Sequence, residues 1–313
     1  SKRIPNLLLK HSFNCLGKVR MALPSAMATI HMNLLHLSDM HFGPRHWLGN
    51  NKKLLEKINS YDVDIVLNTG DSTTDALESE FEEAGQFLQG IDCTNVISIP
   101  GNHDKRNMRS ADYFRQYIDD IEVIRPLNRD NCRKHHLYLD SHTTGISDHF
   151  TDINFLKKIK VNSETILLVC LDSNELYKDT GFVDKEILKA VSERIRSEVY
   201  DRIVLLNHHS ILDTDSDPLF NSKIVIEFVR EHKINHVFCG HTHQLSIMKS
   251  TDLYHGHSFV QYKNGSLSSA NTPNDTNMFI YYSDFGTETM KIHIIRSEIK
   301  GGDLNFREEI VAL

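Results

Sequence analysis

Five short polar clusters, each directly behind a short apolar run, constrain this chain more than any other feature. The clusters are Asp39-Met40-His41, Gly70-Asp71, Gly101-Asn102-His103-Asp104, Asn207-His208-His209 and Gly240-His241-Thr242-His243. The preceding runs are short and rich in Val, Ile and Leu, which is typical of buried strands rather than helices. The sequence therefore predicts an open α/β sheet with Asp, Asn and His at the carboxyl ends of its strands. That edge is where such sheets bind ligands.

The residue types in these clusters indicate a metal site. Carboxylate, amide and imidazole groups without thiolates are the ligand set for Mn, Fe or Zn. Taken singly, Gly-Asp is a common turn dipeptide, and the Asp-x-His and Asn-His-His clusters are compatible with simple turns at strand ends. All five clusters in order, each behind a strand, favour a two-metal phosphoesterase.

These motifs resemble the signature of the calcineurin-like metallophosphoesterase superfamily, and the resemblance runs from about Leu34 to about Asn271. Ser72-Thr73-Thr74 follows the Gly-Asp motif, whereas the protein Ser/Thr phosphatases continue with Asp-Arg-Gly there. Leu171-Asp172-Ser173 ahead of Gly181, followed by the His pair and Gly-His-Thr-His, is similar to the class III cyclic-nucleotide phosphodiesterase branch. Ser210-Ile211 departs from that branch, which usually has a proline soon after the His pair.

The resemblance implies an α/β fold: a four-layer αββα sandwich of two mixed β-sheets flanked by helices. It also implies two divalent metal ions (Mn, Fe or Zn) with Asp71 as the bridging carboxylate. The first metal would be held by Asp39, His41 and His243, and the second by Asn102, His208 and His241. Alternate residues such as His241 and His243 can reach two centres about 3.5–4 Å apart. A hydroxide between the metals would be the nucleophile.

Two histidines next to these ligands have roles that the residues leave open. We expect His103 to be catalytic, stabilising the transition state or protonating the leaving oxygen, with Asp104 fixing its tautomer. The alternatives are that His103 is a further ligand or a simple hydrogen-bond donor. His209 is the alternative to His208 as ligand, and only the resemblance favours the first histidine of the pair.

Substrate contacts are expected in the loop after the first motif. Arg45 and Trp47, the single Trp of the chain, could offer a cation and an aromatic plane to a phosphate or nucleobase, although Trp47 could equally cover the core of its own loop. Asn102 and His209 are further candidate contacts. Lys105 and Arg106 could reach phosphate oxygens or be solvated, and residues 266–271 would line the cleft by analogy with the family.

Composition limits the partners. The chain has 313 residues, and residues 1–31 carry five basic side chains and no acidic one. The remainder has 30 basic against 42 acidic residues, a formal charge of −12, so long nucleic acid is a less expected partner than a small phosphodiester. No apolar run approaches the roughly 20 residues of a membrane span. Five cysteines without paired spacing indicate a reducing, cytoplasmic location, and a homodimer is left open.

We expect residues 1–31 to be an expression leader, a transit peptide or a native arm, and residues 32–313 to be a single metallophosphoesterase catalytic domain. Apolar spacing predicts helices over 51–60, 76–89, 109–118, 184–200 and 222–232. Alternation predicts strands over 135–140 and 165–171, then a run of antiparallel strands over 245–248, 258–262, 278–282 and 289–295.

The sequence thus predicts a metal-dependent phosphoric ester hydrolase: a phosphodiesterase acting on a small diester such as a cyclic nucleotide. A DNA or RNA nuclease and a phosphomonoesterase are the alternatives. A basic groove or a DNA-binding appendage would favour the nuclease, and neither is evident. A non-catalytic scaffold is less expected, because no ligand position has been lost.

Overall fold

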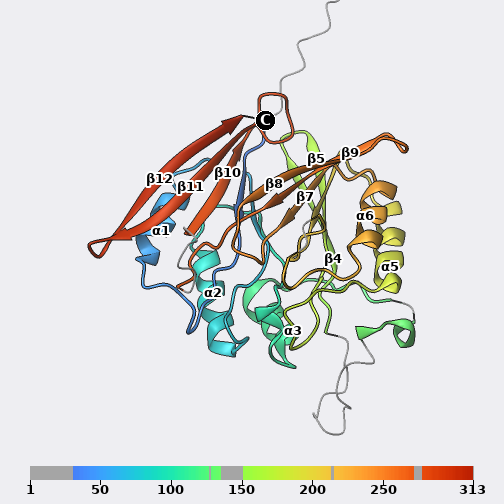
Figure 1. Cartoon of the computed structure of the whole chain (residues 1–313), viewed down its shortest axis with the longest axis horizontal. Coiled ribbons are helices and arrows are strands. Elements are labelled where there is room, and N and C mark those ends of the chain that lie inside the picture. Colours follow the sequence, from blue (N-terminus) through green and yellow to red (C-terminus); the bar gives the residue numbers. More distant parts are fainter. Residues whose placement is uncertain (1–30, 127, 135–150, 213–214, 271–276, 313) are drawn as a thin grey trace, which may run out of the picture.

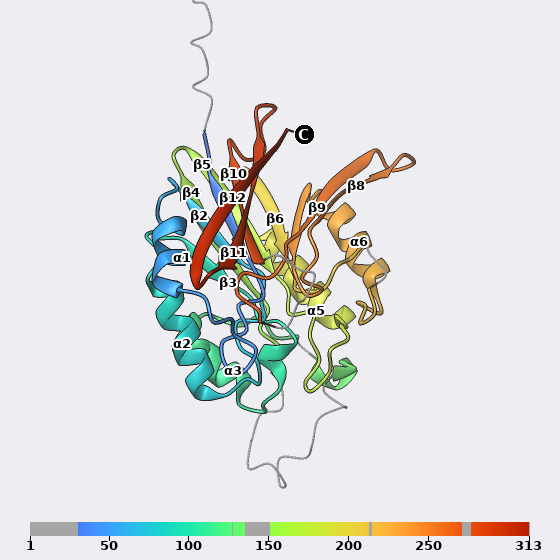
Figure 2. The ribbon, with the colours of Figure 1, turned by 60° about the vertical axis from the view of Figure 1, so that its left-hand side comes forward.

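The computed structural model describes residues 31–126, 128–134, 151–212, 215–270 and 277–312, and its framework is a pair of facing six-stranded sheets (Figures 1 and 2). The first sheet runs, in spatial order, β12 (Asp303–Ala312), β11 (Lys291–Lys300), β10 (Asn277–Ser283), β1 (Leu34–Leu37), β2 (Ile65–Asn68) and β3 (Val96–Ser98). The second runs β4 (Phe155–Val161), β5 (Glu164–Cys170), β6 (Arg202–Leu206), β7 (His236–Cys239), β9 (His257–Lys263) and β8 (Ser246–Asp252).

Helices cover the outer faces of both sheets. The first sheet carries α1 (Asn51–Ile58) and α2 (Glu78–Gln89), and the second carries α5 (Lys185–Arg196) and α6 (Ser222–Glu231) (Figure 2). In α5, Ile187, Val191 and Ile195 recur at helical spacing and are buried, whereas the charged residues between them face solvent. The remaining turns are α3 (Ser110–Tyr113), the π-helical turn Phe114–Ile118 and the 3₁₀ turns His103–Lys105 and Arg129–Asn131.

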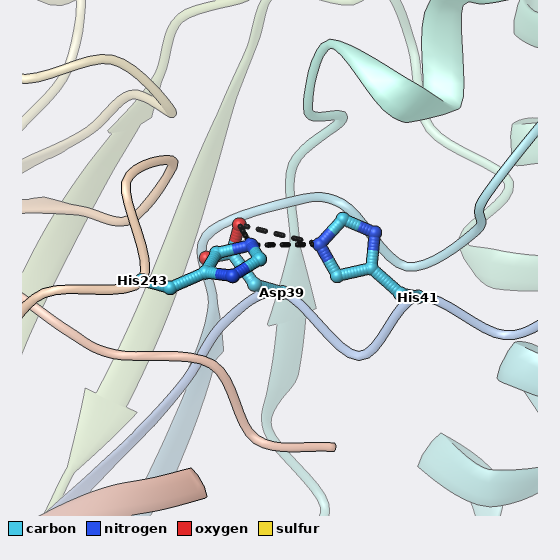
Figure 3. A group of neighbouring side chains, drawn as sticks. All are labelled: Asp39, His41 and His243. Carbon is cyan, nitrogen blue, oxygen red and sulfur yellow. Dashed lines mark hydrogen bonds and ion pairs between the residues drawn. The ribbon is translucent and has the colours of Figure 1, made fainter. Parts of the chain in front are cut away.

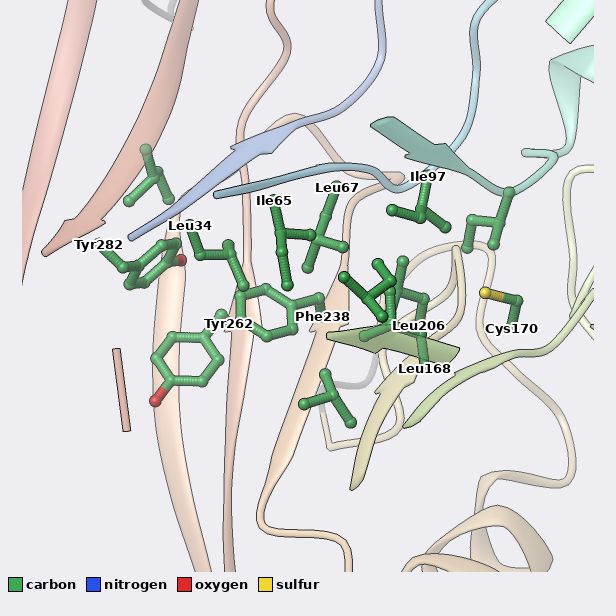
Figure 4. Close-up of a cluster of buried hydrophobic side chains, with 14 of the residues drawn as sticks. Leu34, Ile65, Leu67, Ile97, Leu168, Cys170, Leu206, Phe238, Tyr262 and Tyr282 are labelled. Atoms are coloured by element: carbon green, nitrogen blue, oxygen red, sulfur yellow. The ribbon is translucent and has the colours of Figure 1, made fainter. Parts of the chain in front are cut away.

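The largest hydrophobic cluster lies between the two sheets (Figure 4). Leu34, Ile65 and Ile97 point from the first sheet towards Leu168 and Phe238 of the second. Because residues alternate between the two faces of a strand, the neighbours of these residues pack outwards against the helices. The four expected layers are therefore confirmed as helices, sheet, sheet and helices.

Parallel pairing brings the strand ends of each sheet to one edge. β1 pairs in parallel with β2, and β2 with β3; in the second sheet β5, β6, β7 and β9 are parallel neighbours. The register sets Leu37 opposite Asn68, and Asn68 opposite Ser98. The polar clusters that follow these strands consequently start at the same level.

Several elements differ from the sequence expectations. The helix expected over 109–118 divides into an α-helical and a π-helical turn. The expected antiparallel run is shared between the sheets: β8 and β9 join the second and β10 and β11 the first, with β9 parallel to β7. The sequence patterns do not predict β4 and β12, and the strand expected over 135–140 lies outside the described residues. Within the described ranges, no helix combines the length and the apolar character that crossing a bilayer requires.

Candidate metal centre

The first group of ligand-type side chains comes from the loops after β1 and β7. The Nε2 atoms of His41 and His243 face each other at 2.9 Å (Figure 3). Oδ1 of Asp39 lies 3.3 Å from Nε2 of His243 and 3.9 Å from Nε2 of His41. Asp39 and His41 are fully buried. Three atoms that can each donate an electron pair to a cation therefore converge on one point.

The second group joins the loops after β3, β6 and β7. Oδ1 of Asn102 lies 3.0 Å from Nε2 of His208 and 3.0 Å from Nδ1 of His241. The other ring nitrogen of each histidine binds a backbone carbonyl: Nδ1 of His208 that of Thr69 at 2.7 Å, and Nε2 of His241 that of Asp217 at 3.0 Å. These carbonyls fix the rings, and the sequence contained no signal that identified them.

Asp71, in the loop after β2, lies between the two groups. Its Oδ2 is 3.8 Å from Nε2 of His41 and 3.5 Å from Nε2 of His208. Its Oδ1 accepts a hydrogen bond of 2.8 Å from the backbone N–H of His103. This carboxylate is thus within reach of ligand atoms of both groups, the position expected of a bridging residue.

The backbone of these loops adopts a conformation that is rare for residues other than glycine. Asp39, His41, Asp71, His241 and His243 all have positive φ, between 51° and 80°, a region that non-glycine residues enter rarely. Hydrogen bonds between neighbouring loops hold this arrangement: the backbone N–H of Asp39 donates to the Gly70 carbonyl and that of His41 to the Asp71 carbonyl, both at 2.9 Å. Strained backbone of this kind clusters at functional sites.

Burial and mutual charge shift the acid–base properties of the site. Burial alone would raise the pKa of Asp71, but His208, His103 and His41 together hold this pKa well below its usual range. Burial would lower the pKa of His208, yet the Asp71 carboxylate raises it to about 9. For His41, burial outweighs the two carboxylates and lowers the pKa to about 3. Anionic carboxylates and a neutral His41 suit cation binding.

The surroundings of His103 correct one expectation. Its Nδ1 donates to the carbonyl oxygen of Thr74 at 2.6 Å, and its Nε2 lies 3.1 Å from Nη1 of Arg45. Asp104 does not orient the ring. It accepts bonds from Thr73 and from the backbone N–H groups of Ser72 and Gly101, so it supports the loop, and burial raises its pKa to about 6.

Trp47 and Lys105, which the sequence offers as contacts to a nucleobase or a phosphate, are both buried. Trp47 is 5% exposed, packs in the cluster beneath α1 and donates from Nε1 to Asn51 at 2.9 Å. Lys105 is fully buried and its Nζ lies 2.8 Å from Oδ2 of Asp172. The idea of Trp47 as a nucleobase platform is therefore wrong, because its ring covers the core of its own loop.

His208 and His209 differ in their hydrogen-bond partners. Nδ1 of His209 lies 2.8 Å from Oγ of Ser173, and its Nε2 lies 2.9 Å from the Asp179 carbonyl oxygen. Both ring nitrogens of His209 are thus engaged away from the ligand groups, which argues against its roles as ligand and as substrate contact. Of residues 266–271, Ser266 donates to the Asp39 carbonyl at 2.7 Å and so supports the first loop, while residue 271 lies outside the described ranges.

The side chains of these groups fit divalent cation binding. Oδ1 of Asp39 is buried, has no hydrogen-bond partner among the described residues and faces the ligand nitrogen of His243. The donor set consists of oxygen and imidazole nitrogen atoms, which suits Mn, Fe or Zn.

Comparison with known proteins agrees with this geometry. The family model for calcineurin-like phosphoesterases matches residues 32–245. A "Probable cyclic nucleotide phosphodiesterase" of Vesicomyosocius okutanii is 23% identical over 229 residues, covering 69% of this chain and 81% of that protein. The match to the family model spans all five motifs.

Solved structures share the fold at low sequence identity. GAP50, described as the anchor in the inner membrane complex of Plasmodium, has a TM-score of 0.52 and 10% identity, covering 89% of this chain and 88% of its own. Purple acid phosphatase PPD1 from yellow lupin has a TM-score of 0.51 and 10% identity, covering 85% of this chain and 51% of its own. From the family match over residues 32–245, on a fold that these structures share, the chain belongs to the calcineurin-like phosphoesterase family.

Proposed function

We propose that the protein is a binuclear-metal phosphodiesterase that hydrolyses a small phosphodiester, with a 3′,5′-cyclic nucleotide as the leading candidate. The observation that carries this proposal is the convergence of carboxylate, amide and imidazole atoms from five loops on two adjoining groups that share Asp71. The relative named as a cyclic nucleotide phosphodiesterase supports the choice of substrate class.

In the proposed site, Asp39, His41 and His243 would hold one cation, and Asn102, His208 and His241 the other, with Asp71 shared. Divalent cations in these positions would supply Lewis acidity and lower the pKa of water. Asp71 would reduce the repulsion between the two positive charges, because its Oδ2 is near nitrogens of both groups.

His103 and Arg45 would act on the phosphoryl group and the leaving oxygen. The Thr74 carbonyl fixes the proton on Nδ1 of His103, so Nε2 is the atom that would transfer a proton. Arg45 contacts that nitrogen, and none of the ion pairs among the described residues joins Arg45 to a carboxylate. A guanidinium without a carboxylate partner beside the site is suited to bind a phosphoryl oxygen.

Charge favours a small substrate over a polymer. A phosphodiester monomer carries one negative charge, whereas a nucleic acid meets the acidic body of this protein, −12 for residues 32–313, along its whole contact. A compact diester would therefore enter at a lower electrostatic cost.

The test is a substrate comparison after reconstitution with Mn²⁺, Fe²⁺ or Zn²⁺. Hydrolysis of 3′,5′-cyclic nucleotides, bis-p-nitrophenyl phosphate, p-nitrophenyl phosphate and single-stranded DNA is measured for the wild type, with Asp71→Ala as the control for contaminating phosphatases. We expect the highest kcat/KM for a small diester. A higher kcat/KM for single-stranded DNA would favour a nuclease, and one for p-nitrophenyl phosphate a phosphomonoesterase; either result would refute the proposal.

A further inference from the structure

The second ligand group depends on an amide whose two ends differ in chemistry but hardly in shape. The side chain of Asn102 ends in an oxygen that can bind a cation and an NH₂ group that cannot. In the structure, Oδ1 faces His208 and His241, at 3.0 Å from a ring nitrogen of each. A rotation of about 180° about the last side-chain bond would turn the NH₂ group towards the cation instead. Some other group must therefore select the orientation.

That group is a carboxylate from a different loop. Nδ2 of Asn102 donates to Oδ1 of Asp179 at 2.9 Å. Asp179 lies between β5 and α5, in a stretch that the five motifs do not include. An ionised carboxylate accepts hydrogen bonds and donates none, so it can bind only the NH₂ end of the amide. We propose that Asp179 is a positioning residue that holds the Asn102 oxygen towards the second metal; this inference rests on the proposed function.

Asp179 is itself held in place and charged. Nη2 of Arg106 donates to the same Oδ1 at 2.9 Å. The guanidinium group next to Asp179 favours the ionised carboxylate, which accepts hydrogen bonds and donates none.

The same loop also binds the ring of the neighbouring His209. The backbone carbonyl of Asp179 accepts from Nε2 of His209, and the Ser173 hydroxyl contacts Nδ1. Gly181 permits this approach, since a Cβ there would lie 2.8 Å from the His209 ring. One loop thus orients Asn102, a member of the second group, and binds His209, a neighbour of that group.

The experiment measures Mn²⁺ binding to the full chain by isothermal titration and by the electron paramagnetic resonance signal of coupled Mn²⁺ pairs. We expect Asp179→Ala to weaken the second Mn²⁺ by about 10–100-fold, the usual effect of losing a residue that orients a ligand, and to leave the first unchanged. In Asp179→Asn, Arg106 can still turn the side-chain oxygen of residue 179 towards the Asn102 NH₂ group, because it donates to that same position, so this variant should recover most of the affinity.

The matched control is Asp75→Ala. Asp75 is the other carboxylate beside Arg106, with Oδ1 3.6 Å from Nη1, and its side chain is about as exposed as that of Asp179, 49% against 51%. No hydrogen bond or ion pair joins Asp75 to Asn102 within the described ranges, so its removal should leave both affinities unchanged. An equal loss in Asp75→Ala, or an unchanged second affinity in Asp179→Ala, would overturn the inference.

A double-mutant cycle separates positioning from a general structural effect. If Asp179 acts through Asn102, Asp179→Ala should cause no further loss of Mn²⁺ affinity once Asn102 is already Ala. An additive loss would overturn the inference. Binding of two Mn²⁺ by the wild type without hydrolysis of any diester would refute the proposed function alone, whereas failure to bind a second Mn²⁺ would refute both.

Discussion

Gly70→Ala is expected to damage both folding and metal binding, because Gly70 lies where the loops after β2, β3 and β6 meet. A Cβ on Gly70 would lie 2.6 Å from the backbone nitrogen of Gly101, 2.8 Å from its Cα and 2.8 Å from Nδ1 of His208. Two of these atoms belong to backbone and cannot rotate away. The φ of Gly70 is also +104°, which side-chain-bearing residues rarely adopt.

Gly302→Ala is the control that separates the cost of positive φ from the cost of the Cβ contacts. Gly302 has φ +87°, and a Cβ there would meet nothing within 4 Å. Positive φ alone costs about 1–2 kcal/mol, so this should be the whole loss in Gly302→Ala. Gly70→Ala adds overpacking against backbone, about 1–3 kcal/mol, for a total of roughly 2–5 kcal/mol.

Urea unfolding of the metal-free protein measures these losses, and a Mn²⁺ titration measures the effect on the site. We expect Gly70→Ala to lower the unfolding free energy by more than Gly302→Ala, and also to weaken the Mn²⁺ that His208 would bind, since the added methyl group displaces the His208 ring. Gly302→Ala should leave Mn²⁺ affinity unchanged. Equal unfolding free energies in the two variants, or unaltered Mn²⁺ affinity in Gly70→Ala, would refute this reasoning.

Three further predictions concern single side chains. Asp71→Ala should lose at least one of two bound metals in elemental analysis, because it removes the carboxylate that both groups share; wild-type metal content and rate would contradict the bridging role. His103→Ala should keep its metals but lower kcat by ~10²–10⁴, with a smaller loss for a p-nitrophenol leaving group, which needs little protonation. His36 is fully buried, and burial lowers its pKa to about 3, below its value in the unfolded chain. It therefore favours the folded state above about pH 6.5, and this contribution declines by up to about 1.4 kcal/mol per pH unit as the pH falls towards 3. Urea unfolding of the metal-free protein at pH 7.5 and 5 should show a shallower pH dependence for His36→Gln than for the wild type, and parallel curves would count against this assignment.

The framework of the fold could be predicted from the sequence because short buried strands leave a direct signal. The runs at Leu34, Ile65 and Ile203 are predominantly apolar and buried, since both faces of these strands are covered. β12, by contrast, mixes charged and apolar residues at the edge of its sheet and resembles a solvated segment. Which sheet a later strand joins depends on pairing between distant residues, and no local pattern encodes that pairing.

The candidate site, like the fold, could be predicted only in part from the sequence. Asp39, Asp71 and Asn102 could be identified because each follows a strand whose end reaches a common edge. The groups that orient them could not. The Thr74 carbonyl at His103 is a backbone atom with no sequence signature, and Asp179 is an ordinary loop carboxylate until the fold brings it to Asn102. The pairing of His103 with Asp104 was inferred from adjacency, yet consecutive side chains in a 3₁₀ turn project in different directions.

Positive φ at the proposed ligands explains why the orienting groups are numerous. Each such residue costs of order 1–3 kcal/mol, so the loops keep this conformation only where other bonds hold it. Those bonds cross between loops: the backbone N–H groups of Asp39 and His41 donate to the loop after β2, Ser266 donates to the Asp39 carbonyl, and Asp71 accepts from the backbone N–H of His103. The loops after β2 and β3 and the segment with Ser266 thus support residues that other loops carry. A change in one loop should therefore disturb ligands on its neighbours, which is why Gly70→Ala is expected to reach His208, a residue of the other sheet.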